Sequence, residues 1–427
     1  MGSKLVPEAL ACRLMRLHFL ALFVALALLA GACGGGDGDN ESTESDGDIA
    51  DDDDPAATPT SSSVAPGTTI SVSPPTTRGP APLVEVDPLG EFGGVQILSG
   101  EPLYSGVFGQ IAVSRNVVAP VALPPAAQAP GVAPLTGLPM TPADAERPAI
   151  IVKLDNTAKG RPQESLSQAD LVYVLMVENG VTRLAAVFHS VEPEVLGPVR
   201  SGRTSDIALF SSLNNPIFAY SGANLLQHAV IRRFEMIDLG AGTRSEYHRA
   251  PDRPGTYDLM TLPSDLWSIA ASRETAGPPS PHFEYRDESV GLPPSASSAR
   301  SITIDYPSAT SLWEFDVEAG GWARTQDGEP HVDADGARIV ATNVLVAEVD
   351  HVRTGSLDTV GTTVFEEQFL GTGRGWVATD GHVIEVTWTK PSLDSVATWT
   401  TADGVPVALL PGQSWVEIAP IGSVTVG

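Results

Sequence analysis

The chain has 427 residues, of which 42% are apolar, and carries 52 acidic against 25 basic side chains, a formal net charge of −27. This length suffices for two ordinary domains, at roughly 100–200 residues per domain. The acidic excess argues against a nucleic-acid partner, because such partners are met by a net basic surface. Ten carboxylates and no Lys or Arg lie in residues 37–54, so the rest of the chain is only moderately acidic.

The first 32 residues have the pattern of an export signal. Residues 19–32 form a run of fourteen without a polar side chain, and Lys4, Arg13 and Arg16 precede it. A membrane-spanning helix needs about 20 apolar residues, whereas the core of a signal peptide needs roughly 7–15. We therefore expect residues 1–32 to be a signal peptide that is not part of the fold.

The signal ends in small residues directly before a cysteine, Leu29-Ala30-Gly31-Ala32-Cys33. This resembles the lipobox of bacterial lipoproteins, although Ala30 stands where that motif usually has Leu. The resemblance implies that Cys33 is lipidated and holds the chain to the extracytoplasmic face of the cell membrane. The alternative is a plain signal peptide in which Cys33 is incidental. Cys12, the second of two cysteines, lies inside the signal, so we expect no disulfide and no cysteine metal site.

Two segments separate this cysteine from the first regular pattern. Residues 33–82 are Gly, Asp, Ser, Thr and Pro with few large apolar side chains, a composition that cannot offset its ordering entropy. We expect a disordered tether there, and a partly ordered lead-in over residues 83–133.

The remaining sequence predicts an α+β protein with two domains. Residues 134–295 alternate strand and helix patterns, which predicts a mixed α/β domain. Residues 300–420 lose the helical period and predict a smaller β-rich domain. The expected elements of the first domain are strands 149–154, 171–178, 181–189 and 217–220 and helices 162–169, 205–213 and 224–234. The expected strands of the second are 301–306, 312–315, 339–349, 383–388, 405–410 and 414–418.

Strands 171–178 and 181–189 are separated by Asn179-Gly180, the strongest short hairpin signal. A two-residue turn places Glu178 opposite Val181 and brings Arg183 diagonally beside Glu178 on one face of the sheet. We expect an ion pair between Glu178 and Arg183. It is either a surface pair or part of a cleft.

Several strings together resemble a known family. They are Pro134-Leu135-Thr136-Gly137-Leu138, Arg161-Pro162-Gln163, Leu166-Ser167-Gln168-Ala169-Asp170, residues 197–203, Thr387-Trp388-Thr389-Lys390 and Pro411-Gly412-Gln413-Ser414-Trp415. They are similar to the YerB-like lipoproteins, whose domain of unknown function 3048 has an N-terminal and a C-terminal part. The resemblance covers roughly residues 134–420 and implies an exported lipoprotein. It implies no activity.

The loop at residues 197–203, Gly-Pro-Val-Arg-Ser-Gly-Arg, is the most suggestive site. Two glycines free the backbone, Arg200 and Arg203 offer forked donors, and Ser201 and Thr204 add hydroxyls before an expected helix N-terminus. This set would hold a phosphate or carboxylate, with Arg161 and Arg183 as helpers. In the alternative, Arg200 and Arg203 pair with carboxylates of the domain and lock the loop. The candidate carboxylates are Asp155, Asp170 and Glu178.

Catalytic signals are weaker. No Gly-x-Ser-x-Gly or Ser-x-x-Lys motif is present in the sequence, and Asp155, Glu178 and His189 are the candidates for acid–base chemistry. The start of a calcium-like loop at residues 331–336 lacks the distal Glu, so we read a turn at Asp335-Gly336 and expect no metal or other cofactor. The four tryptophans after residue 375 pack a core or form a glycan platform, with core packing the more frequent use.

These observations favour a lipid-anchored envelope protein that acts as a binding or accessory module, without enzymatic activity, for an anionic envelope ligand such as a cell-wall polymer. The alternatives are an envelope hydrolase or transferase acting on a glycan or wall polymer, and a structural partner of another envelope protein.

Overall fold

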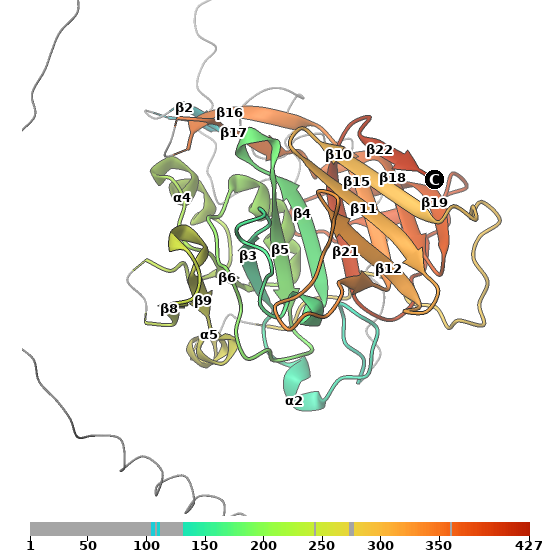
Figure 1. Ribbon diagram of the computed structural model, residues 1–427, viewed down its shortest axis with the longest axis horizontal. Helices are drawn as coiled ribbons and strands as arrows, with labels where there is room; N and C mark the ends of the chain where they lie inside the picture. The colour runs from blue at the N-terminus through green and yellow to red at the C-terminus, as the bar shows by residue number, and fades with distance from the viewer. Residues whose placement is uncertain (1–103, 107–108, 112–130, 243–244, 273–276, 359–360) are drawn as a thin grey trace, which may run out of the picture. The chain divides into compact units, whose positions relative to one another are not determined.

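The computed structural model describes residues 104–106, 109–111, 131–242, 245–272, 277–358 and 361–427 (Figure 1). The expected signal peptide, Cys33, the tether and most of the lead-in lie outside the described residues. Within the lead-in, β1 (Tyr104–Gly106) and β2 (Gly109–Ile111) form a short antiparallel pair.

Ten strands form one mixed sheet through the middle of the molecule. β21 is parallel to both of its neighbours, β15 and β4. In spatial order the strands are β20 (Thr398–Thr400), β19 (His382–Lys390), β18 (Gly371–Thr379), β15 (Asn343–Val349), β21 (Ser414–Pro420), β4 (Leu171–Met176), β5 (Thr182–Phe188), β3 (Ile150–Asp155), β6 (Ile217–Ala219) and β7 (Ile237–Asp238).

The two regions that the sequence predicts as domains share this sheet. The five strands from β4 to β7 come from residues 134–295, and the five from β20 to β21 come from residues 300–420. Because β21 hydrogen-bonds to β4 along residues 414–417, the two regions are halves of one sheet. The change of pattern near residue 300 marks the end of the helices, and it carries no information on which strands pair.

A second, antiparallel sheet covers part of one face of the first. Ile302, Ile304, Trp313 and Trp322 of this sheet are buried against it. Its path is β13 (Glu329–Pro330), β12 (Gly321–Gln326), β11 (Ala309–Asp316), β10 (Ser301–Tyr306) and β22 (Val424–Val426), and β14 (Val340–Ala341) pairs with β12.

Helices and irregular segments, the latter including Phe283, Leu393 and Leu409, cover other parts of the large sheet. On the face that carries the second sheet, α5 (Pro263–Ala270) buries Leu266 and Trp267. On the opposite face lie α4 (Leu225–Ile231) and a continuous helical segment of η4 (Thr204–Asp206), α3 (Ile207–Phe210) and η5 (Ser211–Leu213). Both faces are therefore covered, which explains why β3, β4 and β15 are buried at every position and read as near-continuous apolar runs.

Shorter elements complete the described chain. Figure 1 shows α4, β8, β9 and α5 on the side of β6, away from the C-terminal strands. The elements not yet given are α2 (Pro142–Ala145), η2 (Leu166–Gln168), η3 (Glu178–Gly180), β8 (Tyr247–Arg249), η6 (Gly255–Tyr257), β9 (Leu259–Thr261), β16 (His351–Leu357) and β17 (Thr363–Glu367).

Most of the expected elements are confirmed, and four differ. The strand expected over residues 339–349 is divided into β14 and β15, which belong to different sheets. The helix expected over residues 162–169 is reduced to η2, because residues 163 and 164 are held by bridges to Asp333 and Gly197. Residues 405–410 make isolated bridges instead of a strand. The hairpin connection is a three-residue turn, η3, because Val177 pairs with Val181.

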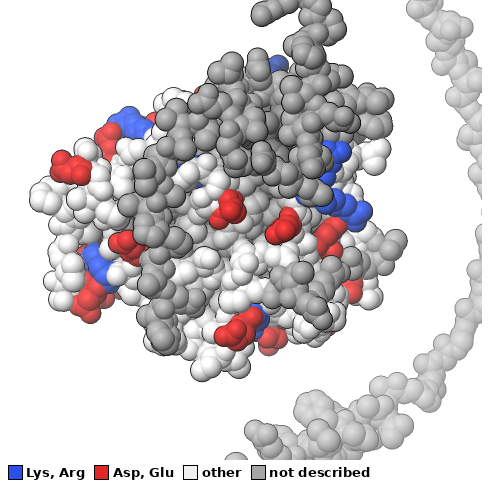
Figure 2. Space-filling model, turned by 180° about the vertical axis from the view of Figure 1, so that it is seen from behind, with Lys and Arg blue, Asp and Glu red and all other residues white. Residues whose placement is uncertain are grey.

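The four C-terminal tryptophans lie in the core. Trp376, Trp388, Trp399 and Trp415 are at most 5% exposed. Core packing is confirmed, and the glycan platform is wrong for these side chains. On the face drawn in Figure 2, the described acidic groups lie singly or beside basic ones, as expected for a moderately acidic fold.

Candidate functional site

Most of the predicted site residues meet at one edge of the large sheet. β3 and β4 both run antiparallel to β5, so their carboxyl ends and the amino end of β5 share this edge. Asp155 is the last residue of β3, Glu178 follows β4 by two residues, and Arg183 is the second residue of β5. Chain order alone thus brings two carboxylates and a guanidinium together.

The loop at residues 197–203 runs along the same edge. Its backbone bridges β3 at Leu154, and the Arg200 N–H donates to the Lys153 carbonyl at 2.8 Å. Its first glycine permits close packing: a Cβ at Gly197 would lie 2.0 Å from the Met260 sulfur. The expectation that this glycine frees the backbone is therefore wrong, since its small size fixes the loop against β9.

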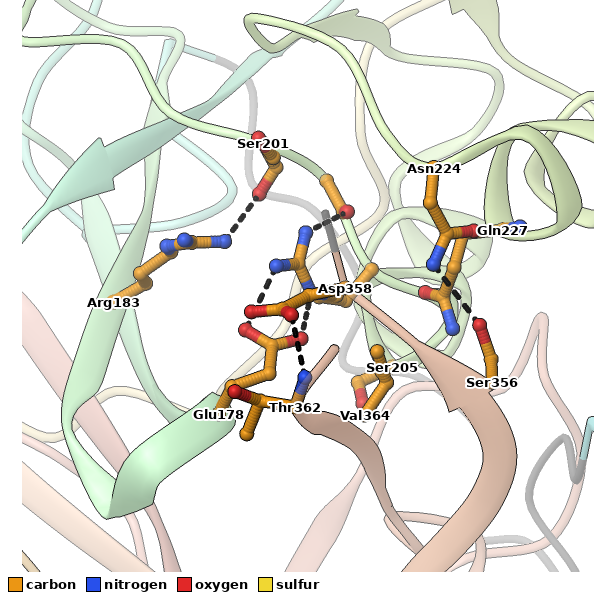
Figure 3. A network of polar contacts seen from close by, with 12 residues as sticks. Glu178, Arg183, Ser201, Ser205, Asn224, Gln227, Ser356, Asp358, Thr362 and Val364 are labelled. Carbon is orange, nitrogen blue, oxygen red and sulfur yellow. Dashed lines mark hydrogen bonds and ion pairs between the residues drawn. The ribbon is translucent and has the colours of Figure 1, made fainter. Parts of the chain in front are cut away.

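Arg203 and Glu178 form a buried bidentate ion pair. The Arg203 Nε and Nη2 atoms lie 2.6 and 2.7 Å from the two Glu178 oxygens (Figure 3). Burial opposes the ionisation of Glu178, but the hydrogen bonds and charge of Arg203 outweigh it, so the pKa of Glu178 lies below its ordinary value. The expected pair between Glu178 and Arg183 is wrong, because the three-residue turn lifts Glu178 off the strand ladder.

Arg200 is held in a similar way. Its Nε lies 2.8 Å from Asp155 Oδ2, and its Nη1 donates to the Thr256 carbonyl at 3.1 Å. Its guanidinium also lies 5.5 Å from the centre of the Tyr257 ring. Two of the three carboxylates considered as structural partners, Asp155 and Glu178, therefore pair with Arg200 and Arg203.

A third ion pair lies deeper in the molecule, and the sequence analysis does not predict it. Lys153 Nζ is 2.7 Å from Asp206 Oδ1, and both side chains are at most 1% exposed. The available signal was a lysine inside the apolar run of residues 150–154, where a charge needs a partner. Asp206 Oδ2 also accepts the Arg203 N–H at 2.7 Å and so fixes the start of the helical segment.

Glu367, at the end of β17, lies beside this pair. Its backbone N–H donates to the Ser205 hydroxyl at 3.2 Å, and its side chain is buried. Burial raises the pKa of Glu367 to about 7, although the Ser205 hydroxyl and the charge of Lys153 act against the rise. One carboxyl oxygen of Glu367 has no hydrogen-bond partner among the described residues.

Arg183 differs from the other cations at this edge. Its Nη1 donates to the Ser201 carbonyl at 3.2 Å (Figure 3), and no ion pair joins it to a described carboxylate. Burial, followed by the charge of Arg203, lowers the pKa of Arg183 to about 10. The side chain nevertheless keeps some solvent contact. The Ser201 and Ser221 hydroxyls lie 3.4 Å apart near this carbonyl, and both residues are partly exposed.

The other predicted site residues lie elsewhere or point inward. Arg161 pairs with Asp327 at 2.9 Å and so contacts the second sheet. The Thr204 hydroxyl is buried without a described partner. His189 follows β5 at the opposite edge of the sheet, where burial and then Arg147 lower its pKa to about 4. The three acid–base candidates are thus not brought together.

The described residues show neither a cluster of metal ligands nor a membrane-spanning helix. Among the described residues, no three His, Cys, Asp or Glu side chains converge as metal ligands. Asp333 of the calcium-like string instead accepts the N–H groups of Leu166 and Ser167 at 3.1 and 2.9 Å. Within the described ranges, no helix is long and apolar enough to cross a membrane.

The comparisons with known proteins identify the family. The family described as Protein of unknown function (DUF3048) matches through its N-terminal domain over residues 135–276 and its C-terminal domain over residues 302–416. The chain belongs to this family, which confirms the expected membership.

Two relatives agree with this assignment. The chain is 28% identical over 302 residues to "Putative lipoprotein YerB" of Bacillus subtilis (strain 168), an alignment that covers 67% of this chain and 86% of that protein. The crystal structure of the YerB protein from Bacillus subtilis matches with a TM-score of 0.59 at 23% identity, over 69% of this chain and 99% of that one. The second match shows a shared fold.

Proposed function

We propose that the protein is an exported lipoprotein, anchored by lipid on Cys33 at the extracytoplasmic face of the cell membrane, whose folded region binds an anionic group of the envelope. The anchor is supported by the apolar signal, by the small residues before Cys33, and by the name of the Bacillus relative. The polar segment from residue 33 to 82 would act as the spacer between the membrane and the fold.

The binding proposal depends on the charges at the sheet edge. Three cations have carboxylate partners, as Lys153 pairs with Asp206, Arg200 with Asp155 and Arg203 with Glu178. Arg183 is the fourth cation, and its described partner is a neutral carbonyl. The charges of Glu178 and Asp155 favour the Arg183 guanidinium, but both carboxylates are ion-paired with other arginines. A phosphate or carboxylate bound directly to Arg183 would further offset the cost of burying this charge.

Neighbouring groups suit the same ligand. Ser201 and Ser221 add hydroxyl donors beside Arg183. Arg200 keeps 24% of its side chain exposed and supports the loop through Asp155. In this arrangement Arg183 contacts the ligand, whereas Arg200 and Arg203 hold the loop in place.

The enzyme alternative has less support from the geometry. A hydrolase or transferase using Asp155, Glu178 and His189 needs acid and base groups within reach of one substrate bond. Asp155 and Glu178 are each ion-paired with an arginine, and His189 lies at the opposite edge of the sheet. We therefore favour binding, with a wall polymer or another acidic envelope component as the ligand.

Binding of the full-length, detergent-purified protein to isolated envelope fractions tests the proposal. Wild type should bind in a salt-sensitive manner, because exposed charge interactions are screened. Arg183→Gln should lower the affinity by about tenfold or more, the effect of losing a charged hydrogen-bond pair. Its melting temperature should stay the same or rise, because the substitution removes a charge without a carboxylate partner.

Arg374→Gln is the matched control. Arg374 forms an exposed pair with Glu385 on β18 and β19, four strands away from β5 in the same sheet. Binding by Arg183→Gln at the wild-type level would overturn the proposed site. Equal losses in both variants would indicate a diffuse effect of net charge.

A further inference from the structure

A cavity of about 500 Å³ opens at the end of the helical segment, away from the Arg183 edge. Its volume lies within the range of roughly 300–1,000 Å³ that is typical of small-molecule sites. Its walls come from four separate stretches of the chain. They are Ser211, Ser212, Asn214 and Asn215; Phe234 and Glu235; Ser280; and Ser392, Leu393 and Asp394.

The lining has a distinctive chemistry. Four serines, two asparagines and two carboxylates supply hydroxyl, amide and carboxylate groups, and no Lys or Arg is among the described residues of the lining. The charged groups among these described lining residues, Glu235 and Asp394, would repel a phosphate or carboxylate ligand. A ligand with many hydroxyls, or with an amine or amide N–H, would instead find both acceptors and donors.

One aromatic ring adds an apolar surface. Phe234 packs partly against the core and is partly exposed at the cavity. Sugars combine polar hydroxyl edges with apolar C–H faces, and such faces stack on aromatic rings. Phe234 therefore suits a ligand that is polar at its edge and apolar on its face.

The asparagine wall is fixed in position. Asn214 and Asn215 both have left-handed backbone conformations, with φ of 58°, which Asn tolerates better than most residues. The Asn214 side-chain amide donates to the Pro278 carbonyl at 2.9 Å and joins two walls of the cavity. A wall already held in place loses less entropy when a ligand binds.

We propose that this cavity binds an uncharged or amino sugar unit of a polyhydroxylated glycan. The site is separate from the proposed anion site, because it shares no residue with the group around Arg183. The carboxylates Glu235 and Asp394 accept sugar hydroxyl or amide hydrogens, and Phe234 stacks on the sugar ring. Such a site would add glycan recognition to a lipoprotein of the envelope.

Calorimetric titration of the full-length protein with a tetramer of β-1,4-linked N-acetylglucosamine tests this inference. We expect saturable binding at neutral pH. Ser280→Trp should weaken binding by about tenfold or more, because the exposed Ser280 lines the cavity and an indole would fill part of it. Phe234→Leu keeps the apolar volume and removes the ring, so it should weaken binding by about threefold to tenfold.

Two controls separate this site from other effects. Ser289→Trp places the same side chain at an exposed serine of another loop, and it should leave binding unchanged. Arg183→Gln should also leave glycan binding unchanged, so a failure of the anion proposal is distinguishable from a failure here. Absence of saturable binding, or binding that Ser280→Trp does not weaken, would overturn the inference.

Discussion

At the scale of single residues, the sheet edge is stabilised by buried pairs whose partners are far apart in sequence. Glu178 is 4% exposed, and its two oxygens meet two nitrogens of Arg203. The energetic cost of such a pair appears when one member is removed, because the other is then a buried charge without a partner.

Arg203→Gln should therefore lower the free energy of unfolding by about 3–5 kcal/mol. Urea unfolding followed by circular dichroism measures this loss. Arg374→Gln, in an exposed pair, should change it by less than about 0.5 kcal/mol. If Arg203→Gln were as stable as wild type, the pair with Glu178 would not hold the loop, and Arg203 would return as a candidate ligand residue.

Glu367 gives a prediction on pH. Its ordinary pKa is 4.5, and burial raises it to about 7 in the folded protein. Between these values the folded state keeps a proton that the unfolded state has released, so ionisation of Glu367 destabilises the fold as the pH rises from 4.5 to 7.

Glu367→Gln imitates the protonated side chain at every pH. Relative to wild type, the variant should gain stability as the pH rises, by up to about 3 kcal/mol above pH 7. Urea unfolding of both proteins at pH 5 and pH 8 tests this. The exposed Glu385→Gln is the control and should show little dependence on pH. An unchanged difference between wild type and Glu367→Gln at the two pH values would contradict the prediction.

At the scale of elements, local sequence patterns predict where strands and helices lie better than they predict turn length and strand register. The apolar run at residues 149–154 and the helix signal at 224–234 correspond to β3 and α4, and Asn224 caps α4 by accepting the Gln227 N–H at 2.8 Å. The hairpin was recognised, but its turn has three residues. A shift of one residue decided which arginine Glu178 meets.

The same limit applies to the candidate site. The grouping of Asp155, Glu178 and the arginine loop was accessible from the sequence, because polar residues followed each apolar run. The sequence does not predict which charged side chains meet. Asp206 and Glu367 come close to Lys153 because of the positions of a helix and a strand that only the tertiary fold defines. The cavity at Phe234 is lined by four stretches that are distant in the sequence, so no continuous sequence motif predicts it.

At the scale of the whole molecule, the two family regions depend on each other. β21 lies between β15 and β4, so each half supplies an edge that the other covers. A buried chain of hydrogen bonds also joins them. Arg324 donates to His331 Nδ1 at 2.8 Å, His331 Nε2 to Gln163 at 2.8 Å, and the Gln163 amide to the Asp155 carbonyl at 2.7 Å. This direction requires a neutral His331, in agreement with burial and Arg324, which lower its pKa well below 6.5.

Shared strands and shared polar groups predict a single cooperative unfolding transition. The α-helices of the described residues all lie before residue 277, and six of the seven tryptophans lie after residue 300. Far-ultraviolet circular dichroism at 222 nm therefore reports mainly on the first half, and tryptophan fluorescence mainly on the second. The two signals should give the same urea midpoint in wild type, and Arg203→Gln in the first half should lower both midpoints together.

Separated halves give the sharper version of this prediction. A fragment of residues 131–299 loses β21 and exposes the edge of β4, whereas a fragment of residues 300–427 exposes the edge of β21. An exposed strand edge with apolar side chains on both faces promotes association between fragment molecules instead of folding. Each fragment alone should therefore lack a cooperative transition, and co-expression should restore a soluble complex. A cooperative transition in either isolated fragment would show that the half folds by itself and that the shared sheet forms by docking of two finished domains.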